Sequence, residues 1–122
     1  MAQFATKIID REPAVPAAAI DRGQLARITL GDRNLEREVL QLFDRQAGLL
    51  LARMRNGEAA AVLAHTLKGS AMSIGATGVV LAAAAVEQAA QAADRDLAIG
   101  RLATAIGIAC ADIAGLLSAS QG

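Results

Sequence analysis

The residue of this chain whose type is best suited to chemistry is His65, the single histidine among 122 residues. Lys68 follows it at the spacing of one helical turn. An exposed imidazole is a nucleophile in its own right. A lysine one turn away could offset the charge of a phosphoryl group carried on that imidazole. We therefore consider phosphoryl transfer on His65 as a first hypothesis.

Other uses of these side chains were weighed against it. One histidine and one cysteine, Cys110, are too few to form a metal-ligand set. A catalytic triad needs a nucleophile and an orienting acid in a cleft, and the sequence has no strand–turn–helix elbow to supply them. It also lacks the GxxxxGK[ST] loop of nucleotide-binding proteins. A general-base role for His65, and a surface histidine without chemistry, both stay open.

The segment around the histidine has the periodicity of an amphipathic helix, which we predict over residues 58–74. At about 100° per residue, His65 points roughly 160° away from Leu67, so we expect the imidazole to face away from the core. The predicted apolar stripe consists of Ala60, Leu63, Ala64, Leu67, Ala71 and Ile74.

Small residues flank the histidine on this predicted outer face. Ala61 precedes it by one turn, and Gly69 follows it by one turn. Glycine costs about 1 kcal/mol in a helix interior relative to alanine. The close approach of another surface is the simplest reason for Gly69, and we assign Ala61, Gly69 and Met72 to a partner-binding surface. Met72 is equally compatible with an ordinary surface position.

A second helix is predicted over residues 76–93, after a turn at Gly75. Glu87 is the only charged residue between Lys68 and Asp94. If the two helices run antiparallel, His65 and Glu87 lie at about the same height, since both are similarly far from the turn. Glu87 could then accept a hydrogen bond from one imidazole nitrogen and leave the other free to attack. Gln88 is the alternative partner, and a solvated Glu87 stays equally possible.

The segment HTLKGSA at residues 65–71, followed by GA at 75–76, resembles the signature of histidine-containing phosphotransfer (HPt) domains of bacterial two-component phosphorelays. The similarity runs from about Ile20 to the C-terminus and is strongest from 64 to 76. It implies a helical bundle with the phosphorylated histidine on the second bundle helix. HPt domains often have an amide or an acid at the position of Glu87.

The resemblance implies a phosphorelay intermediate that accepts a phosphoryl group on His65 from a receiver-domain aspartate and passes it to another receiver domain. The catalytic residues would be His65, Lys68 and Glu87. Such a carrier has no kinase activity and no cofactor of its own, because Mg²⁺ is expected on the receiver. Its partners would be receiver domains of response regulators or hybrid kinases. The alternatives are the substrate domain of a larger kinase, and a helical adaptor that binds a signalling partner without being phosphorylated.

Composition limits the other classes of function. The chain has 12 basic and 12 acidic residues, only two phenylalanines, and no tryptophan or tyrosine, so we expect no nucleic-acid partner. No uninterrupted apolar run reaches the length of about 18 residues that suggests a membrane span. The first residues lack a signal-peptide pattern, and one cysteine cannot form an internal disulfide. We expect a cytoplasmic protein that does not associate with membranes.

The fold expected from these patterns is all-α, an antiparallel up-down-up-down four-helix bundle with an additional short N-terminal helix. Residues 1–16 are expected to be a tail or a short extra helix, and residues 17–122 the HPt-like bundle. The predicted apolar stripe of the long helix contains Leu35, Val39, Leu42, Phe43, Leu50 and Met54. The predicted helices cover residues 17–29, 33–55, 58–74, 76–93 and 97–118. Asp32 is the predicted N-cap of the second of them, and turns are predicted at Asn56-Gly57 and at Asp94-Arg95-Asp96.

Overall fold

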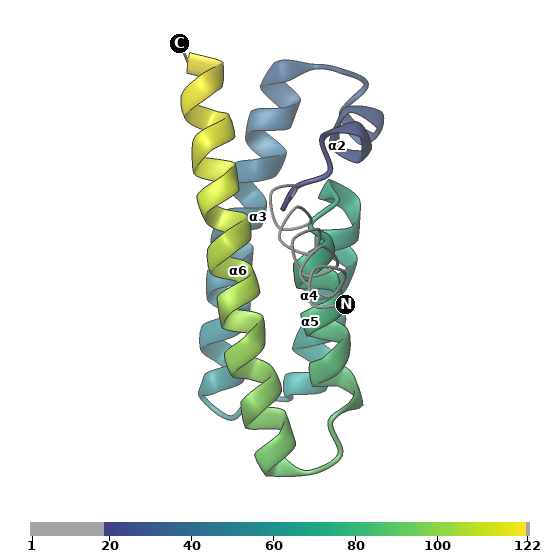
Figure 1. The fold of residues 1–122 in the computed structure, drawn as a ribbon, viewed down its shortest axis with the longest axis vertical. Helices are drawn as coiled ribbons and strands as arrows, with labels where there is room; N and C mark the ends of the chain where they lie inside the picture. Colours follow the sequence, from purple (N-terminus) through teal and green to yellow (C-terminus); the bar gives the residue numbers. More distant parts are fainter. Residues whose placement is uncertain (1–18, 122) are drawn as a thin grey trace, which may run out of the picture.

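The computed structural model describes residues 19–121, and this part of the chain is helical without strands (Figure 1). The all-α class predicted from the sequence is therefore confirmed. The expected tail at residues 1–16 lies outside the described residues. The helices are α2 (Arg22–Thr29), α3 (Arg33–Arg55), α4 (Ala60–Ile74), α5 (Thr77–Gln88) and α6 (Ala92–Gln121).

The four longer helices form a bundle in which each helix packs against its neighbours in sequence. α3 contacts α4, α4 contacts α5, α5 contacts α6, and α6 returns to contact α3. Figure 1 shows the chain running down along α3, up along α4, down along α5 and up along α6. The short helix α2 packs against α3 and α4. α4 thus lies directly beside α5, the neighbour with which it shares the candidate site.

The interior is built from small and branched side chains. On α4 the six residues of the predicted stripe are all buried, and Ala64, Leu67 and Ala71 have no exposed area. Ala47 on α3 and Ala83 on α5 are equally buried. Alanine at these contacts lets neighbouring helices pack closely, while the larger side chains fill the space between them. This packing fixes the rotation of α4 and therefore the direction in which its other residues point.

Two aspartates begin the first two described helices. The Asp21 side chain accepts a hydrogen bond from the Gln24 N–H at 3.1 Å, and the Asp32 side chain accepts one from the Leu35 N–H at 3.1 Å. Each satisfies a backbone donor that a helix start leaves unpaired. The predicted cap at Asp32 and the bounds of α3 are confirmed. The described residues 19–21 are not helical, so the shorter helix begins at residue 22, after its cap Asp21, later than predicted.

The turn between α4 and α5 is held by Gly75. Its φ of 73° lies in the left-handed region that favours glycine. Its carbonyl oxygen accepts a hydrogen bond from the Asp21 N–H at 2.9 Å, and an added Cβ would collide with the Asp21 side chain. Ile20 in turn donates its N–H to the Asp112 carboxylate of α6 at 3.0 Å. The start of the described chain is thereby fixed both to the turn between α4 and α5 and to α6.

The predicted boundary between the last two helices is wrong. α5 ends at Gln88, and Asp94 and Arg95 lie inside the first turns of α6. The real connection contains alanines, which favour helix and give no turn signal. Asp94 is favourable in a first helical turn because of the helix dipole, and the Arg95 Nη2 donates to the Ala89 carbonyl at 3.2 Å. Charged residues that suggested a loop therefore stabilise the new helix.

Part of the predicted stripe on α3 is also wrong. Leu35 and Leu42 are exposed, at 39% and 57%, whereas Leu40 and Ala47 are buried. The buried set follows the spacing of three and four residues through Leu40, Phe43, Ala47, Leu50 and Met54. The predicted set contained large apolar side chains only, so Ala47 in the middle of the buried set was missed.

The last helix has a property that the search for an uninterrupted apolar run did not detect. Its segment Ala92–Ala119 is long and apolar enough, by length and composition, to cross a membrane. In the bundle, α6 packs against α3 and α5. Its buried residues are Ala98, Ile99, Leu102, Ile106, Ala109 and Ile113, which complete the core.

Candidate functional site

His65 lies on the outward face of α4, as its spacing from the apolar stripe predicted. Its side chain is 70% exposed, although Ala64 immediately before it is fully buried. Since consecutive residues of a helix point about 100° apart, burial of Ala64 and Leu67 leaves His65 directed toward solvent. The imidazole is therefore accessible to another macromolecule.

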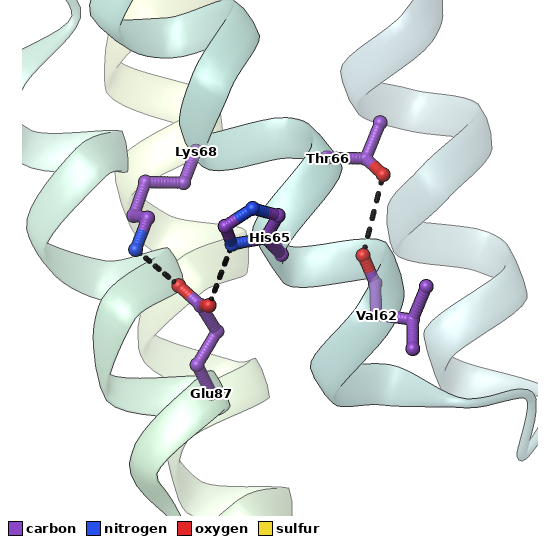
Figure 2. A network of polar contacts seen from close by, with 5 residues as sticks. All are labelled: Val62, His65, Thr66, Lys68 and Glu87. Carbon is purple, nitrogen blue, oxygen red and sulfur yellow. Dashed lines mark hydrogen bonds and ion pairs between the residues drawn. The ribbon is translucent and has the colours of Figure 1, made fainter.

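One nitrogen of this ring contacts α5. His65 Nδ1 lies 2.9 Å from Glu87 Oε2, and Figure 2 shows the two side chains meeting between the helices. The contact expected from the antiparallel geometry of the two helices is confirmed. Gln88, the alternative partner, is exposed. Glu87 is only 21% exposed, so the carboxylate approaches the ring from the side of the bundle.

The second oxygen of the carboxylate has a different partner, which the sequence reasoning missed. Lys68 Nζ lies 2.7 Å from Glu87 Oε1 (Figure 2). This oxygen is buried, and the lysine side chain is 28% exposed. The isolation of Glu87 among uncharged residues was the available signal, because Lys68 has few other acids to pair with. The carboxylate therefore joins two residues of α4 that lie one turn apart.

These contacts determine the protonation of the site. The Lys68 ammonium first, and the His65 ring second, hold the pKa of the Glu87 carboxyl below its ordinary value. Glu87 is therefore ionised at neutral pH and can only accept hydrogen bonds. In the neutral ring, Nδ1 then carries the proton and donates it to Glu87, while Nε2 keeps its lone pair. The arrangement leaves the Nε2 lone pair available for a bond to another group.

The surface around the histidine is formed partly by small and apolar residues. Ala61, Gly69 and Met72 are all exposed, and Met72 is 57% exposed. A Cβ added at Gly69 would meet nothing within 4 Å. Packing inside the described part of the molecule therefore does not require glycine at this position. Val62, 65% exposed, adds an apolar side chain on the same helix (Figure 2).

A polar contact also fixes α4 against α3. Ser70 donates its hydroxyl to Gln46 Oε1 at 2.9 Å, in a partly buried position. Thr66, next to the histidine, instead bonds back to the Val62 carbonyl at 3.3 Å (Figure 2). The Ser70 contact was not predicted, because it depends on how α4 packs against α3. It restrains α4 one turn beyond the imidazole.

No candidate metal-binding group surrounds His65 in the described part of the chain. Across residues 19–121, no three His, Cys, Asp or Glu side chains come together as a metal-binding group. A hollow of about 410 Å³ lies elsewhere, between α2, the start of α3 and the end of α6, and no α4 or α5 residue lines it. The site is thus an open helix face.

The single cysteine is also unsuited to nucleophilic chemistry. Burial first, and a hydrogen bond with Asp44 second, raise the pKa of the Cys110 thiol to about 12, which keeps it protonated.

A family model described as "Hpt domain" matches residues 33–120, which span α3 to nearly the end of α6. The chain belongs to the Hpt domain family. Hpt domains are histidine phosphotransfer carriers of phosphorelays, not kinases, and they interact with receiver domains. Comparisons with curated proteins and with solved structures found no match. Helix α2 and Asp21, whose N–H binds the Gly75 carbonyl, precede the matched segment.

Proposed function

We propose that this Hpt domain is a phosphorelay intermediate that accepts a phosphoryl group on His65 and passes it to a second receiver domain. One observation carries the proposal. The exposed imidazole has Nδ1 held by an ionised carboxylate at 2.9 Å, while its Nε2 has no partner among residues 19–121. An oriented ring with one free lone pair suits attack on a phosphorus atom presented by another protein.

The proposed step begins with an aspartyl phosphate on the donor receiver. The Nε2 lone pair of His65 attacks the phosphorus atom, the P–N bond forms, and the bond between phosphorus and the aspartate oxygen breaks. The aspartate leaves as a carboxylate, and the ring becomes a phosphoimidazolium that keeps its Nδ1 proton. Glu87 stabilises the positive charge that develops on the ring, because its carboxylate accepts from Nδ1. The reverse step delivers the phosphoryl group to the next receiver.

The neighbouring residues have supporting roles in this proposal. Lys68 offsets the negative charge of the phosphoryl group as a point charge. Ala61, Gly69 and Met72 form the docking surface, where glycine allows the receiver loops to approach closely. Mg²⁺ is expected on the receiver, which supplies most of the transition-state stabilisation, and this chain needs no cofactor. Exchange with receiver domains suits the cytoplasmic location that we propose.

The test is transfer from a receiver that carries a radiolabelled aspartyl phosphate. The wild-type chain should acquire an acid-labile, base-stable label, and His65→Gln should acquire none. Thr104→Ala is a suitable control, since Thr104 is exposed on α6 and its hydroxyl, within the described residues, bonds back to the Gly100 carbonyl of its own helix. This control should be labelled at the wild-type rate. If wild type binds the receiver but remains unlabelled, the adaptor function replaces the proposal.

A further inference from the structure

We propose that Lys68 is a positioning residue, which acts on His65 through Glu87 before any phosphoryl group arrives. In this role the ammonium group holds the carboxylate in the place where it accepts the Nδ1 proton. This inference rests on the proposed function, since it explains how Nε2 is kept as the free nitrogen. It adds a role to the charge compensation assigned to Lys68 above.

The contacts form a chain of three groups across two helices. Lys68 Nζ binds Glu87 Oε1 at 2.7 Å, and Glu87 Oε2 binds His65 Nδ1 at 2.9 Å. Each carboxylate oxygen therefore has its own partner on α4. The lysine and glutamate side chains are 28% and 21% exposed, whereas the histidine is 70% exposed. The pair that orients the ring is thus more sheltered from water than the ring itself.

Loss of the lysine would leave Glu87 Oε1 in an unfavourable position. This oxygen is buried, and Lys68 is its partner within the described residues. A buried charged oxygen without a partner is costly, so the carboxylate would turn toward water or take up a proton. Both responses weaken its hold on Nδ1. The imidazole would then return to a mixture of its two neutral tautomers, in one of which Nε2 is protonated and cannot attack.

The two roles of Lys68 make different predictions in a double-mutant cycle. A lysine that acts only on the phosphoryl group should lose the same fraction of the transfer rate whether or not Glu87 is present. A lysine that acts through Glu87 should have little further effect once Glu87 has been replaced by alanine. The cycle therefore compares Lys68→Ala, Glu87→Ala and the double variant with wild type.

The direct readout is ¹⁵N NMR of the histidine ring in the unphosphorylated protein at neutral pH. The signals need no further assignment, because His65 is the single histidine of the chain. Arg53→Ala is a matched control, since it also removes a cation from an ion pair, that of Arg53 and Glu58 at 2.9 Å. The transfer rate from a phosphorylated receiver is measured on the same set of variants.

We expect wild type and Arg53→Ala to hold the Nδ1–H tautomer and Lys68→Ala to show a mixture. We also expect a several-fold slower transfer for Lys68→Ala in the wild-type background and a smaller loss when Lys68→Ala is added to Glu87→Ala, since only the charge compensation then remains to be lost. An unchanged tautomer in Lys68→Ala, or an undiminished loss of rate in the Glu87→Ala background, would overturn the inference. The tautomer measurement needs no phosphate. A wild-type chain that is never labelled therefore contradicts the proposed function without altering the NMR result.

Discussion

Gly69 lies in the C-terminal part of α4 and Gly75 caps the end of this helix, yet their surroundings differ completely. A side chain at Gly75 would collide with Asp21, and its φ of 73° is unfavourable for other residues. A side chain at Gly69 would meet nothing, and the backbone there is ordinary helix. The fold requires glycine at position 75 and does not require it at position 69. An internal contact explains Gly75, whereas no contact within the described residues explains Gly69, which we propose to lie in the docking surface.

The largest effect on stability is expected at the turn. Gly75→Ala places a Cβ against Asp21 and a residue other than glycine in the left-handed region. We expect the free energy of unfolding to fall by about 2–4 kcal/mol, measured by urea denaturation. The matched variant Gly69→Ala should raise it by about 1 kcal/mol, because alanine favours the helix interior. Equal effects of the two substitutions would remove the distinction between these glycines.

The next effect concerns docking. Gly69→Leu should leave the protein folded, since the position is open. We expect its affinity for a receiver domain to fall at least about tenfold, or 1.4 kcal/mol, in isothermal titration calorimetry. Ile108→Ala, a change at an exposed position of α6, is the control and should bind normally. Normal binding by Gly69→Leu would show that no partner surface comes close to this glycine.

The smallest effect is a change in stability with pH. Contacts with Lys68 and His65 lower the pKa of Glu87 in the folded state from its ordinary value of 4.5. The stability that these two contacts contribute is therefore fully present above pH 4.5. It is lost as the pH falls through the lowered pKa that Glu87 has in the folded state. Unfolding free energies of wild type and Glu87→Gln should differ by a constant amount above this range and converge below it. If the difference between the two unfolding free energies grew on acidification, it would contradict this prediction.

Helices with clear local signals could be predicted from the sequence. Asp32 marked the start of α3, and Asn56-Gly57 and Gly75 marked the turns on either side of α4. Caps and left-handed residues act within a few positions, so the sequence contains the whole signal. The contact of His65 with Glu87 followed from the same turn, because the antiparallel geometry brings equidistant residues together.

Features that depend on tertiary packing could not be predicted in this way. The break after Gln88 lies among alanines, whose helix preference is overridden only when α6 packs back on the bundle. The burial of Ala47 in place of Leu42 depends on how closely α3 approaches α4. The pairing of Lys68 with Glu87 depends on rotamers of two long side chains, which spacing along a helix does not determine.

The central claim is that Glu87 holds Nδ1 and leaves Nε2 of His65 as the atom that receives the phosphoryl group. The most direct measurement is ¹⁵N and ³¹P NMR of the chain after phosphorylation by a receiver domain. We predict a single phosphohistidine with phosphorus bonded to Nε2 and a proton retained on Nδ1. Phosphorus on Nδ1, or a phosphoryl group on any other residue, would contradict this account.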